Sequence, residues 1–287
     1  MTATANPTLI TGASGHLGRV VSHEADRAGL PTLLWNRRPD SSLGSSNQVH
    51  ADITSTDAAD QILSEAQAGT VIHLAAITGA QCERDPEAAH ATNVTATLHL
   101  AEAAARAGAT RFVFASTAAV YGDAYARPIV ETDALVGRGA YAATKIAAEA
   151  GLAAIGQRSG MDVVILRIFN LYGDGFTDSL IHRLQNASAS APVTLRGSEN
   201  FVRDYIHVED VAIASMAACR APMPPGTTVI NVGSGAATSN AHLISAIDAS
   251  RRPHVTVEPG SPSHSQADVS RMREILGVTA RTRLPSL

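Results

Sequence analysis

The chain has 287 residues, of which 45% are hydrophobic and 17% charged, and its formal net charge is −4 at pH 7. This composition is typical of a folded protein with one large or two unequal domains, and it excludes an intrinsically disordered chain. No long basic run occurs, so we expect no nucleic-acid partner. No signal-peptide pattern opens the sequence, and no apolar stretch reaches the roughly 18 residues of a membrane span. We therefore expect a cytoplasmic protein with no membrane partner.

Short apolar runs alternate with longer helical stretches through the first part of the chain. Such alternation favours repeated βαβ units, and right-handed crossovers then give a doubly wound parallel sheet, an α/β fold of the Rossmann type. The predicted elements are strands at Thr8–Ile10, Thr32–Trp35, Thr70–Leu74, Arg111–Ala115 and Val163–Ile168, and helices at about Gly15–Ala28, Asp57–Ala66, Pro86–Ala107 and Ala140–Arg158.

The alternation fades after about residue 170, where prolines interrupt the pattern. The stretch Thr228–Gly235, TVINVGSG, is typical of one more strand followed by a turn. We therefore expect a Rossmann domain over residues 1–170 with a returning segment at about 206–237. A smaller substrate-binding domain is expected over residues 171–205 and 238–287.

Three glycines follow the first predicted strand in TLITGASGHLGR. Gly12 permits a tight turn from strand to helix, Gly15 lets the backbone approach a pyrophosphate, and Gly18 lets the helix pack close to the sheet. The phosphates would then lie at the helix N-terminus, where free N–H groups favour anions. The alternative is a glycine-rich turn without a ligand, but the position between strand and helix favours a dinucleotide site.

Tyr141 and Lys145 are four residues apart on a predicted helix, so both project from one face. A lysine ammonium near a tyrosine favours the phenolate and lowers the tyrosine pKa toward the range that suits acid–base catalysis. Upstream, a strand delivers Ser116 and Thr117 to its C-terminal end, where open α/β sheets bind ligands. Each signal alone has a non-catalytic alternative, such as a helix cap or a solvated side chain. The ordered combination favours a catalytic site.

These motifs together resemble the extended short-chain dehydrogenase/reductases, in the group of NAD-dependent epimerase/dehydratase proteins that act on nucleotide sugars. The resemblance covers most of the chain and rests on TGASGHLG, HADITS, VIHLAA, NVTATLHLAEAA, FVFASTAAVYG, YAATK, LRIFNLYG, FVRDYIHVEDVA and NVGSG. It implies that Tyr141 is the catalytic acid/base, that Lys145 binds the nicotinamide ribose, and that Thr117 is the catalytic hydroxyl residue.

The resemblance also implies the residues that bind cofactor and substrate. The expected cofactor-binding residues are Gly12, Ser14, Gly15, His16, Leu17, Gly18, Asn36, Arg37, Arg38, Asp52, Ile53, Leu74, Ala75, Ala76, Ala115, Tyr141 and Lys145. The expected substrate-binding residues are Thr78, Thr117, Ala118, Asn170 and Arg203. Arginine suits a diphosphate because its guanidinium matches phosphate oxygens, although Arg203 could instead pair with the adjacent Asp204. His73, His207 and Asp210 are expected to be structural, and we expect no metal site.

One departure from the family pattern concerns the nucleotide half of the substrate site. Relatives commonly carry an arginine that contacts a substrate phosphate where this chain has Glu258. Three arginines near the end of the chain, Arg271, Arg281 and Arg283, are candidates to replace it.

The residues after the second strand bear on the choice of cofactor. NAD-using relatives usually have an acidic residue there, whereas arginine accommodates the 2′-phosphate of NADP. Asn36, Arg37 and Arg38 therefore favour NADP(H), with NAD(H) as the alternative, unless they form only a solvated basic turn.

The cofactor argument leads to the expected function. We expect an NADPH-dependent ketoreductase that acts on a nucleotide-bound 4-keto-6-deoxyhexose. The first alternative is a nucleotide-sugar 4-epimerase or dehydratase that recycles tightly bound NAD, and the second is a non-catalytic dinucleotide-binding regulator. Two alanine-rich helices, Pro86–Ala107 and Ala140–Arg158, resemble the pair that forms a dimer interface in relatives, so we also expect a homodimer.

Overall fold

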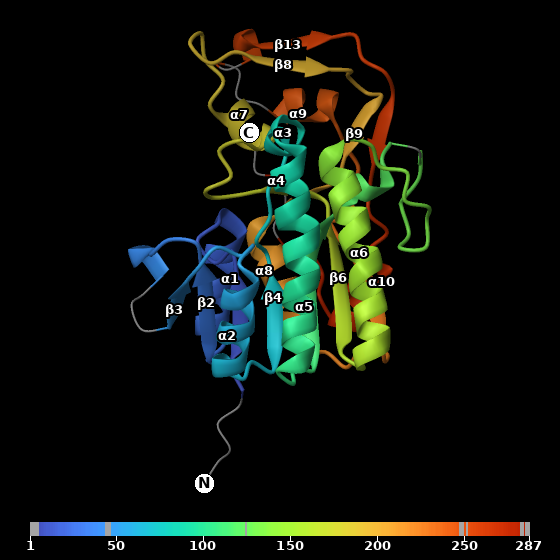
Figure 1. Ribbon diagram of the computed structural model, residues 1–287. Coiled ribbons are helices and arrows are strands. Elements are labelled where there is room, and N and C mark those ends of the chain that lie inside the picture. The colour runs from blue at the N-terminus through green and yellow to red at the C-terminus, as the bar shows by residue number, and fades with distance from the viewer. Residues whose placement is uncertain are drawn as a thin grey trace.

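A seven-stranded parallel sheet forms the centre of the computed structural model, which describes residues 6–43, 47–123, 125–246, 250, 252–281 and 284 (Figure 1). The strand order is β11-β6-β5-β4-β1-β2-β3. The chain builds outward from β1 to one edge and then returns to build the other side, which is the doubly wound arrangement that the sequence predicts. The strands are β1 (Thr8–Thr11), β2 (Thr32–Asn36), β3 (Gln48–His50), β4 (Thr70–His73), β5 (Arg111–Thr117), β6 (Asp162–Ile168) and β11 (Thr227–Val232).

All five strands predicted in the first part of the chain are confirmed to within two residues at either end. The sixth predicted strand is β11, which pairs in parallel with β6 at the edge of the sheet. The sequence analysis missed β3, a strand of three residues with a single apolar side chain, Val49. Its pairing with β2, rather than its own pattern, holds it in the sheet.

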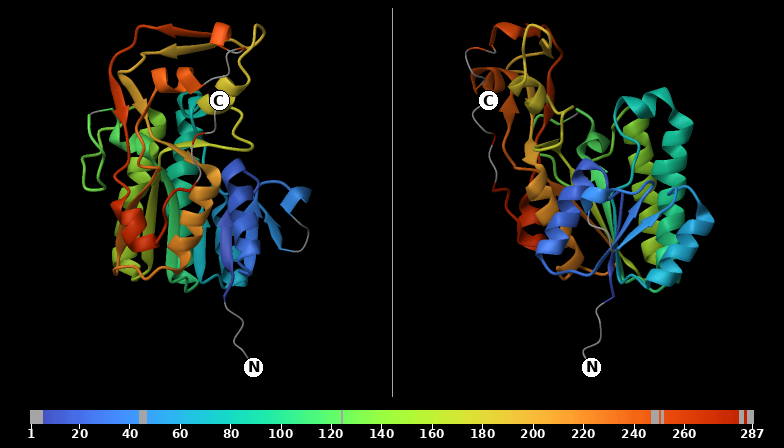
Figure 2. Two further views of the ribbon diagram at one scale, coloured as in Figure 1. Left: turned by 180° about the vertical axis from the view of Figure 1, so that it is seen from behind. Right: turned by 90° about the vertical axis from the view of Figure 1, so that its left-hand side faces the viewer.

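Helices cover both faces of the sheet (Figure 2). Their inward side chains form two apolar clusters, one containing Val21, Val211 and Met272, and the other containing Leu63, Leu100 and Leu152. The first face carries α1 (His16–Arg27), α8 (Val208–Arg220) and α10 (Ser270–Leu276), and the second carries α2 (Thr56–Ala66), α5 (Thr97–Arg106) and α6 (Ala140–Ser159). In the described part of the chain, no helix is long and apolar enough to cross a membrane.

The helix predicted over residues 86–107 is divided into three pieces. They are α4 (Pro86–His90), a π-helical segment η2 (Ala91–Ala96) and α5. Within η2, the Asn93 side chain accepts a hydrogen bond from the Ile77 amide at 2.8 Å and donates one to the Ile77 carbonyl at 2.9 Å. Asn93 on the π-helical segment therefore holds the loop that follows β4. Short π-helical segments of this kind are frequent at functional sites.

A second group of short elements lies beyond the carboxyl ends of the sheet strands (Figure 1). It contains β7 (Asn170–Tyr172), α7 (Leu180–Gln185), β8 (Val193–Arg196), β9 (Phe201–Arg203), β10 (Tyr205–His207), β12 (Thr238–Ser239), α9 (Asn240–Ala246), β13 (Val255–Glu258) and β14 (Ser263–Ser265). Its strands pair as β10-β7, β12-β9-β14 and β13-β8. Short helices η1 (Ser41–Leu43), α3 (Ala80–Arg84), η3 (Ala118–Tyr121) and η4 (Arg252–His254) complete the described elements.

A buried carboxylate ties this second group to the sheet. Asp204, between β9 and β10, is fully buried and accepts hydrogen bonds from the amides of Ser234, Gly235 and Ala267 at 2.8, 2.9 and 3.1 Å. Because a buried carboxylate without partners would be costly, these donors fix the turn after β11 against the β9–β10 junction. The carboxylate is thus committed to the fold.

Candidate active site

The glycine loop packs so closely against neighbouring backbone that a side chain would not fit at Gly12 or Gly18. A Cβ on Gly12, which has a φ of +68°, would lie 2.7 Å from the Ala75 amide nitrogen, and one on Gly18 would collide with the Gly12 carbonyl oxygen. Gly15 lies at the N-cap of α1, whose first amide groups are free to bind an anion. The loop therefore fits a dinucleotide pyrophosphate, as its glycine spacing predicts.

A cavity of about 760 Å³, here called the glycine-loop cavity, opens beside this loop. Nine of the expected cofactor-binding residues line it, namely Gly12, Ser14, Gly15, Arg37, Asp52, Ile53, Leu74, Ala75 and Ala76. Residues on η2, Ala91 and Thr92, form a wall that the sequence analysis missed, because their pattern predicts only an ordinary helix. Of the other expected residues, His16, Leu17 and Gly18 lie in the first turn of α1, and Asn36, Arg38 and Ala115 also lie outside the cavity lining.

The three residues expected to select the cofactor have different environments. The buried Asn36 accepts a hydrogen bond from the Ser14 amide at 2.6 Å, so its side chain supports the glycine loop. Arg37 and Asp52 both line the glycine-loop cavity, whereas Arg38 is exposed outside it. Hydrogen bonds from the Thr54 amide and hydroxyl lower the pKa of Asp52, and the Arg37 charge lowers it further. Arg37 therefore shares this cavity with a carboxylate.

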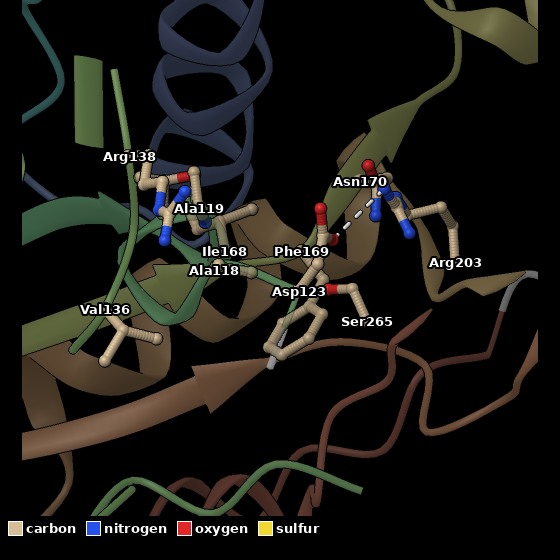
Figure 3. A pocket seen from close by; sticks show the side chains of 12 residues that line it. Ala118, Ala119, Asp123, Val136, Arg138, Ile168, Phe169, Asn170, Arg203 and Ser265 are labelled. Carbon is tan, nitrogen blue, oxygen red and sulfur yellow. Dashed lines mark hydrogen bonds and ion pairs between the residues drawn. The ribbon is translucent and has the colours of Figure 1, made fainter. Parts of the chain in front are cut away.

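A second cavity, of about 630 Å³, is here called the Thr117 cavity (Figure 3). It is lined by four of the expected substrate-binding residues, Thr117, Ala118, Asn170 and Arg203, and also by Ala119, Gly122, Asp123, Val136, Arg138, Ile168, Phe169 and Ser265. The fifth expected residue, Thr78, is exposed before α3 and lines neither cavity.

Arg203 does not form the alternative ion pair with Asp204, whose carboxylate accepts hydrogen bonds from backbone amides. It lies 3.4 Å from Asp123 instead, and its guanidinium carbon lies 4.0 Å from the centre of the Phe201 ring. Burial lowers the pKa of Arg203, and the Asp123 carboxylate opposes that effect. The guanidinium is thus held in place at one side of the Thr117 cavity.

Tyr141 and Lys145 lie on the buried face of α6, as their spacing predicts. The Tyr141 hydroxyl lies close to the side chain of Thr117, at the end of β5. Lys145 donates a hydrogen bond to the Ala115 carbonyl at 2.8 Å. The sequence analysis expected the lysine to lower the tyrosine pKa, but burial dominates and raises the pKa of Tyr141 to about 12. Burial also lowers the pKa of Lys145 to about 8.

A buried ion pair lies beneath these groups, and the sequence analysis missed it. Glu149, one turn beyond Lys145, and Arg167, on β6, are joined by a 2.7 Å contact. Glu149 also accepts a short hydrogen bond from the Ser116 hydroxyl, and Arg167 donates to the Tyr121 hydroxyl at 2.8 Å. A lone arginine within the apolar run of β6 was the available signal, because such a buried charge requires a partner.

The histidines singled out in the sequence have structural contacts. His73 is buried between the hydroxyls of Thr11 and Thr97, at 2.6 and 2.8 Å, and burial lowers its pKa to about 3. His207 precedes α8, and its ring nitrogen accepts a hydrogen bond from the Glu209 amide at 3.4 Å. Asp210 accepts one from the Arg281 amide at 3.1 Å. Among the residues that the structure describes, no three metal-binding side chains gather into a site.

Lys145 gives the free energy of unfolding a specific pH dependence. Its pKa in the folded protein, about 8, lies below the ordinary value of 10.5, so the unfolded chain binds more protons between these pH values. The stability of the nucleotide-free protein should therefore rise relative to that of Lys145→Met between pH 8 and 10, by roughly 2 kcal/mol. Urea denaturation of both proteins across this range measures the difference. Parallel curves would contradict the prediction.

A family model described as "NAD dependent epimerase/dehydratase family" matches residues 8–233. The chain belongs to the NAD-dependent epimerase/dehydratase family. The match confirms the resemblance seen in the motifs, and it spans the glycine loop, Tyr141 and Lys145.

Two similar proteins are both named UDP-glucose 4-epimerase. The UDP-glucose 4-epimerase of Azospirillum brasilense is 29% identical over 96% of this chain and 88% of its own length. That of Rhizobium leguminosarum bv. trifolii is 31% identical over 79% of this chain and 77% of its own.

Solved structures extend the agreement to three dimensions. MoeE5 in complex with UDP-glucose and NAD has a TM-score of 0.86 at 32% identity, covering 97% of this chain and 94% of its own. MoeE5 in complex with UDP-glucuronic acid and NAD has a TM-score of 0.85 at 33% identity, covering 97% and 95%. These relatives favour the NAD-recycling epimerase alternative and give no support to the NADPH ketoreductase that the sequence analysis preferred.

Glu258, at which this chain departs from the epimerase/dehydratase pattern, has an oppositely charged neighbour. Glu258, on β13, lies 3.9 Å from Arg196 on the neighbouring strand β8. Arg271, one of the three candidates to replace the missing arginine, donates to the Val229 carbonyl on β11, lies 3.7 Å from Glu131 and does not line the Thr117 cavity. Arg281 is exposed and does not line the Thr117 cavity, and Arg283 lies outside the described residues.

Proposed function

We propose that the protein is an NAD-dependent 4-epimerase of a UDP-sugar. The placement of Tyr141 close to Thr117 carries the proposal, because it sets a hydroxyl that can transfer a proton beside the wall of the Thr117 cavity. The names of the relatives support the reaction, and the two MoeE5 complexes, each with NAD and a UDP-sugar, support the ligands.

The proposed roles follow from the placement of the side chains. The residues of the glycine-loop cavity would hold NAD, which supplies reversible hydride acceptance at a sugar carbon. Tyr141, in its phenolate form, would accept the proton of the sugar hydroxyl and later return it, and Thr117 would orient that hydroxyl. Lys145 would bring positive charge to the ribose, and Asn170 and Arg203 would bind the diphosphate from the side of the Thr117 cavity that they line.

NAD is proposed in preference to NADP because of how the second strand ends. Arg37 lines the glycine-loop cavity together with the Asp52 carboxylate, whose negative charge opposes the attraction of this end of the cavity for a 2′-phosphate. The Asn36 side chain already accepts a hydrogen bond from the Ser14 amide, and Arg38 does not line the glycine-loop cavity. We therefore propose that these residues do not impose a preference for NADP.

The nucleotide that copurifies with the protein tests this proposal. We expect denaturation of the purified protein to release NAD rather than NADP. The protein should also interconvert UDP-glucose and UDP-galactose, or the corresponding uronic acids, without added cofactor. Release of the nucleotide and product analysis by chromatography measure both. An empty protein that oxidises NADPH with a keto-sugar would instead support the reductase.

The homodimer remains a prediction. It is supported by the alanine-rich α5 and α6, which lie side by side along the sheet (Figure 1). Their close approach is visible at Gly151, where an added Cβ would lie 2.5 Å from a Leu98 methyl carbon. Light scattering of the purified protein measures the mass directly.

A further inference from the structure

One arginine in the Thr117 cavity has no role in the proposed reaction. Arg138 lies in the loop between η3 and α6, three residues before Tyr141. The loop is fixed on both sides of it: the Gly137 amide donates to the Val120 carbonyl at 2.8 Å, and the Ala140 amide donates to the Glu83 carboxylate at 2.7 Å. A Cβ on Gly137 would collide with the Ala119 carbonyl oxygen. Arg138 is therefore mounted on a constrained backbone.

The charges that line this cavity do not balance. Its lining contains two arginines and one carboxylate, and that carboxylate, Asp123, pairs with Arg203 at 3.4 Å. The Arg138 guanidinium makes no hydrogen bond or ion pair with any part of the chain that the structure describes. One permanent positive charge is thus available to a ligand in the cavity.

The free charge lies toward the reacting end of the cavity. Ala118 and Ala119, which directly follow Thr117, line the same wall, and the loop of Arg138 is bonded to this segment. Figure 3 shows Arg138 beside Ala119, while Arg203 and Asn170 enter from the opposite side. A diphosphate bound by Arg203 and Asn170 would therefore leave Arg138 for the sugar.

We propose that Arg138 binds a carboxylate on the sugar, so that the preferred substrate is a nucleotide-activated hexuronic acid. A planar guanidinium can form two parallel hydrogen bonds with a carboxylate, whereas the hydroxymethyl group of a neutral hexose offers no charge to match it. The proposal rests on the proposed function only in assuming that a UDP-sugar binds with its sugar near Thr117.

Equilibrium binding to the NAD-loaded protein tests the proposal without relying on turnover. Dissociation constants for UDP-glucuronic acid and UDP-glucose are measured by calorimetry for the wild type, Arg138→Met and Arg138→Lys. We expect Arg138→Met to weaken UDP-glucuronic acid binding by about 10- to 100-fold, the equivalent of a charge-assisted contact, and UDP-glucose binding by less than about threefold. Arg138→Lys should retain part of the preference for UDP-glucuronic acid, since lysine keeps the positive charge but cannot form the two parallel hydrogen bonds of a guanidinium.

Arg127→Met is the matched control. Arg127 lies in the same excursion of the chain before α6, pairs with the Asp133 carboxylate at 2.7 Å, and does not line the cavity. It should change neither dissociation constant. Equal weakening of both sugars by Arg138→Met would assign Arg138 to the diphosphate and overturn the proposal, as would no change in either. Selective binding of the uronic acid without epimerisation would refute the proposed function and leave this inference standing.

Discussion

Tyr141→Phe is expected to lower kcat by about 10²- to 10⁴-fold, the usual contribution of a positioned acid or base, while bound NAD is retained. The reason lies in the site. The hydroxyl of Tyr141 lies close to Thr117 at the wall of the Thr117 cavity, and phenylalanine removes only that oxygen. The aromatic ring on α6 is kept. Turnover of UDP-glucose or UDP-glucuronic acid, followed by product chromatography, measures the loss.

Tyr125→Phe is the control for this substitution. The Tyr125 hydroxyl donates to the Ala134 carbonyl at 3.1 Å, in the irregular segment before α6, so the change also removes one tyrosine hydroxyl with a hydrogen bond. It should leave kcat within about twofold. If Tyr141→Phe kept more than a tenth of the wild-type rate, Tyr141 would not be the acid/base. The NAD released from each variant after denaturation shows whether the cofactor site has survived.

The second large effect concerns stability. Glu149→Leu and Arg167→Met should each lower the free energy of unfolding by about 3–5 kcal/mol, because each leaves the partner buried and uncompensated. Only 5% of the Glu149 side chain and 6% of the Arg167 side chain are exposed. The double variant should lose less than the sum of the two, since neither charge is then buried alone. Urea denaturation of all four proteins gives the coupling energy.

An exposed ion pair on the same helix supplies the comparison. Arg158, on α6, lies 3.1 Å from Glu102 on α5, with 63% and 46% of the two side chains exposed. Solvent screens such a pair, so Arg158→Met should cost less than about 1 kcal/mol. Equal losses at Arg158 and Arg167 would show that burial does not set the value of these pairs. A full loss at Glu149 with none at Arg167 would show that Ser116, rather than the arginine, is the important partner.

Elements that are set by residues adjacent to them in the sequence were predicted from the sequence. The strands of the first part are apolar on both sides because helices cover both faces of the sheet, which makes them recognisable as short continuous runs. The glycine loop was equally clear, since each glycine answers a local requirement for space. By contrast, β3 and the short strands beyond the sheet exist through pairing with distant partners, and their few residues carry no period of their own.

The same distinction applies to the candidate site. Thr117 and Tyr141 were predicted because a strand end and a helical turn fix where they lie. Arg138 was not, since its position depends on an irregular loop bonded to Val120 and Glu83, far away in the sequence. The NADP preference drawn from the second strand is not shown, and it depends on a similar long-range arrangement. Arg37 reads as an isolated charge in the sequence, and only the fold shows that it lines a cavity together with Asp52.

The edge strand β11 has a consequence for the order in which the protein is made. It pairs with β6, but the whole of β7 to β10 and α8 is synthesised between them. A nascent chain therefore carries β6 as an open edge, with unpaired backbone groups and apolar neighbours, until the residues of β11 emerge. A premature stop anywhere in this interval would leave the central sheet without its edge strand, although the glycine loop would already have been made. The central sheet is thus completed only after most of the strands that lie beyond it have been synthesised.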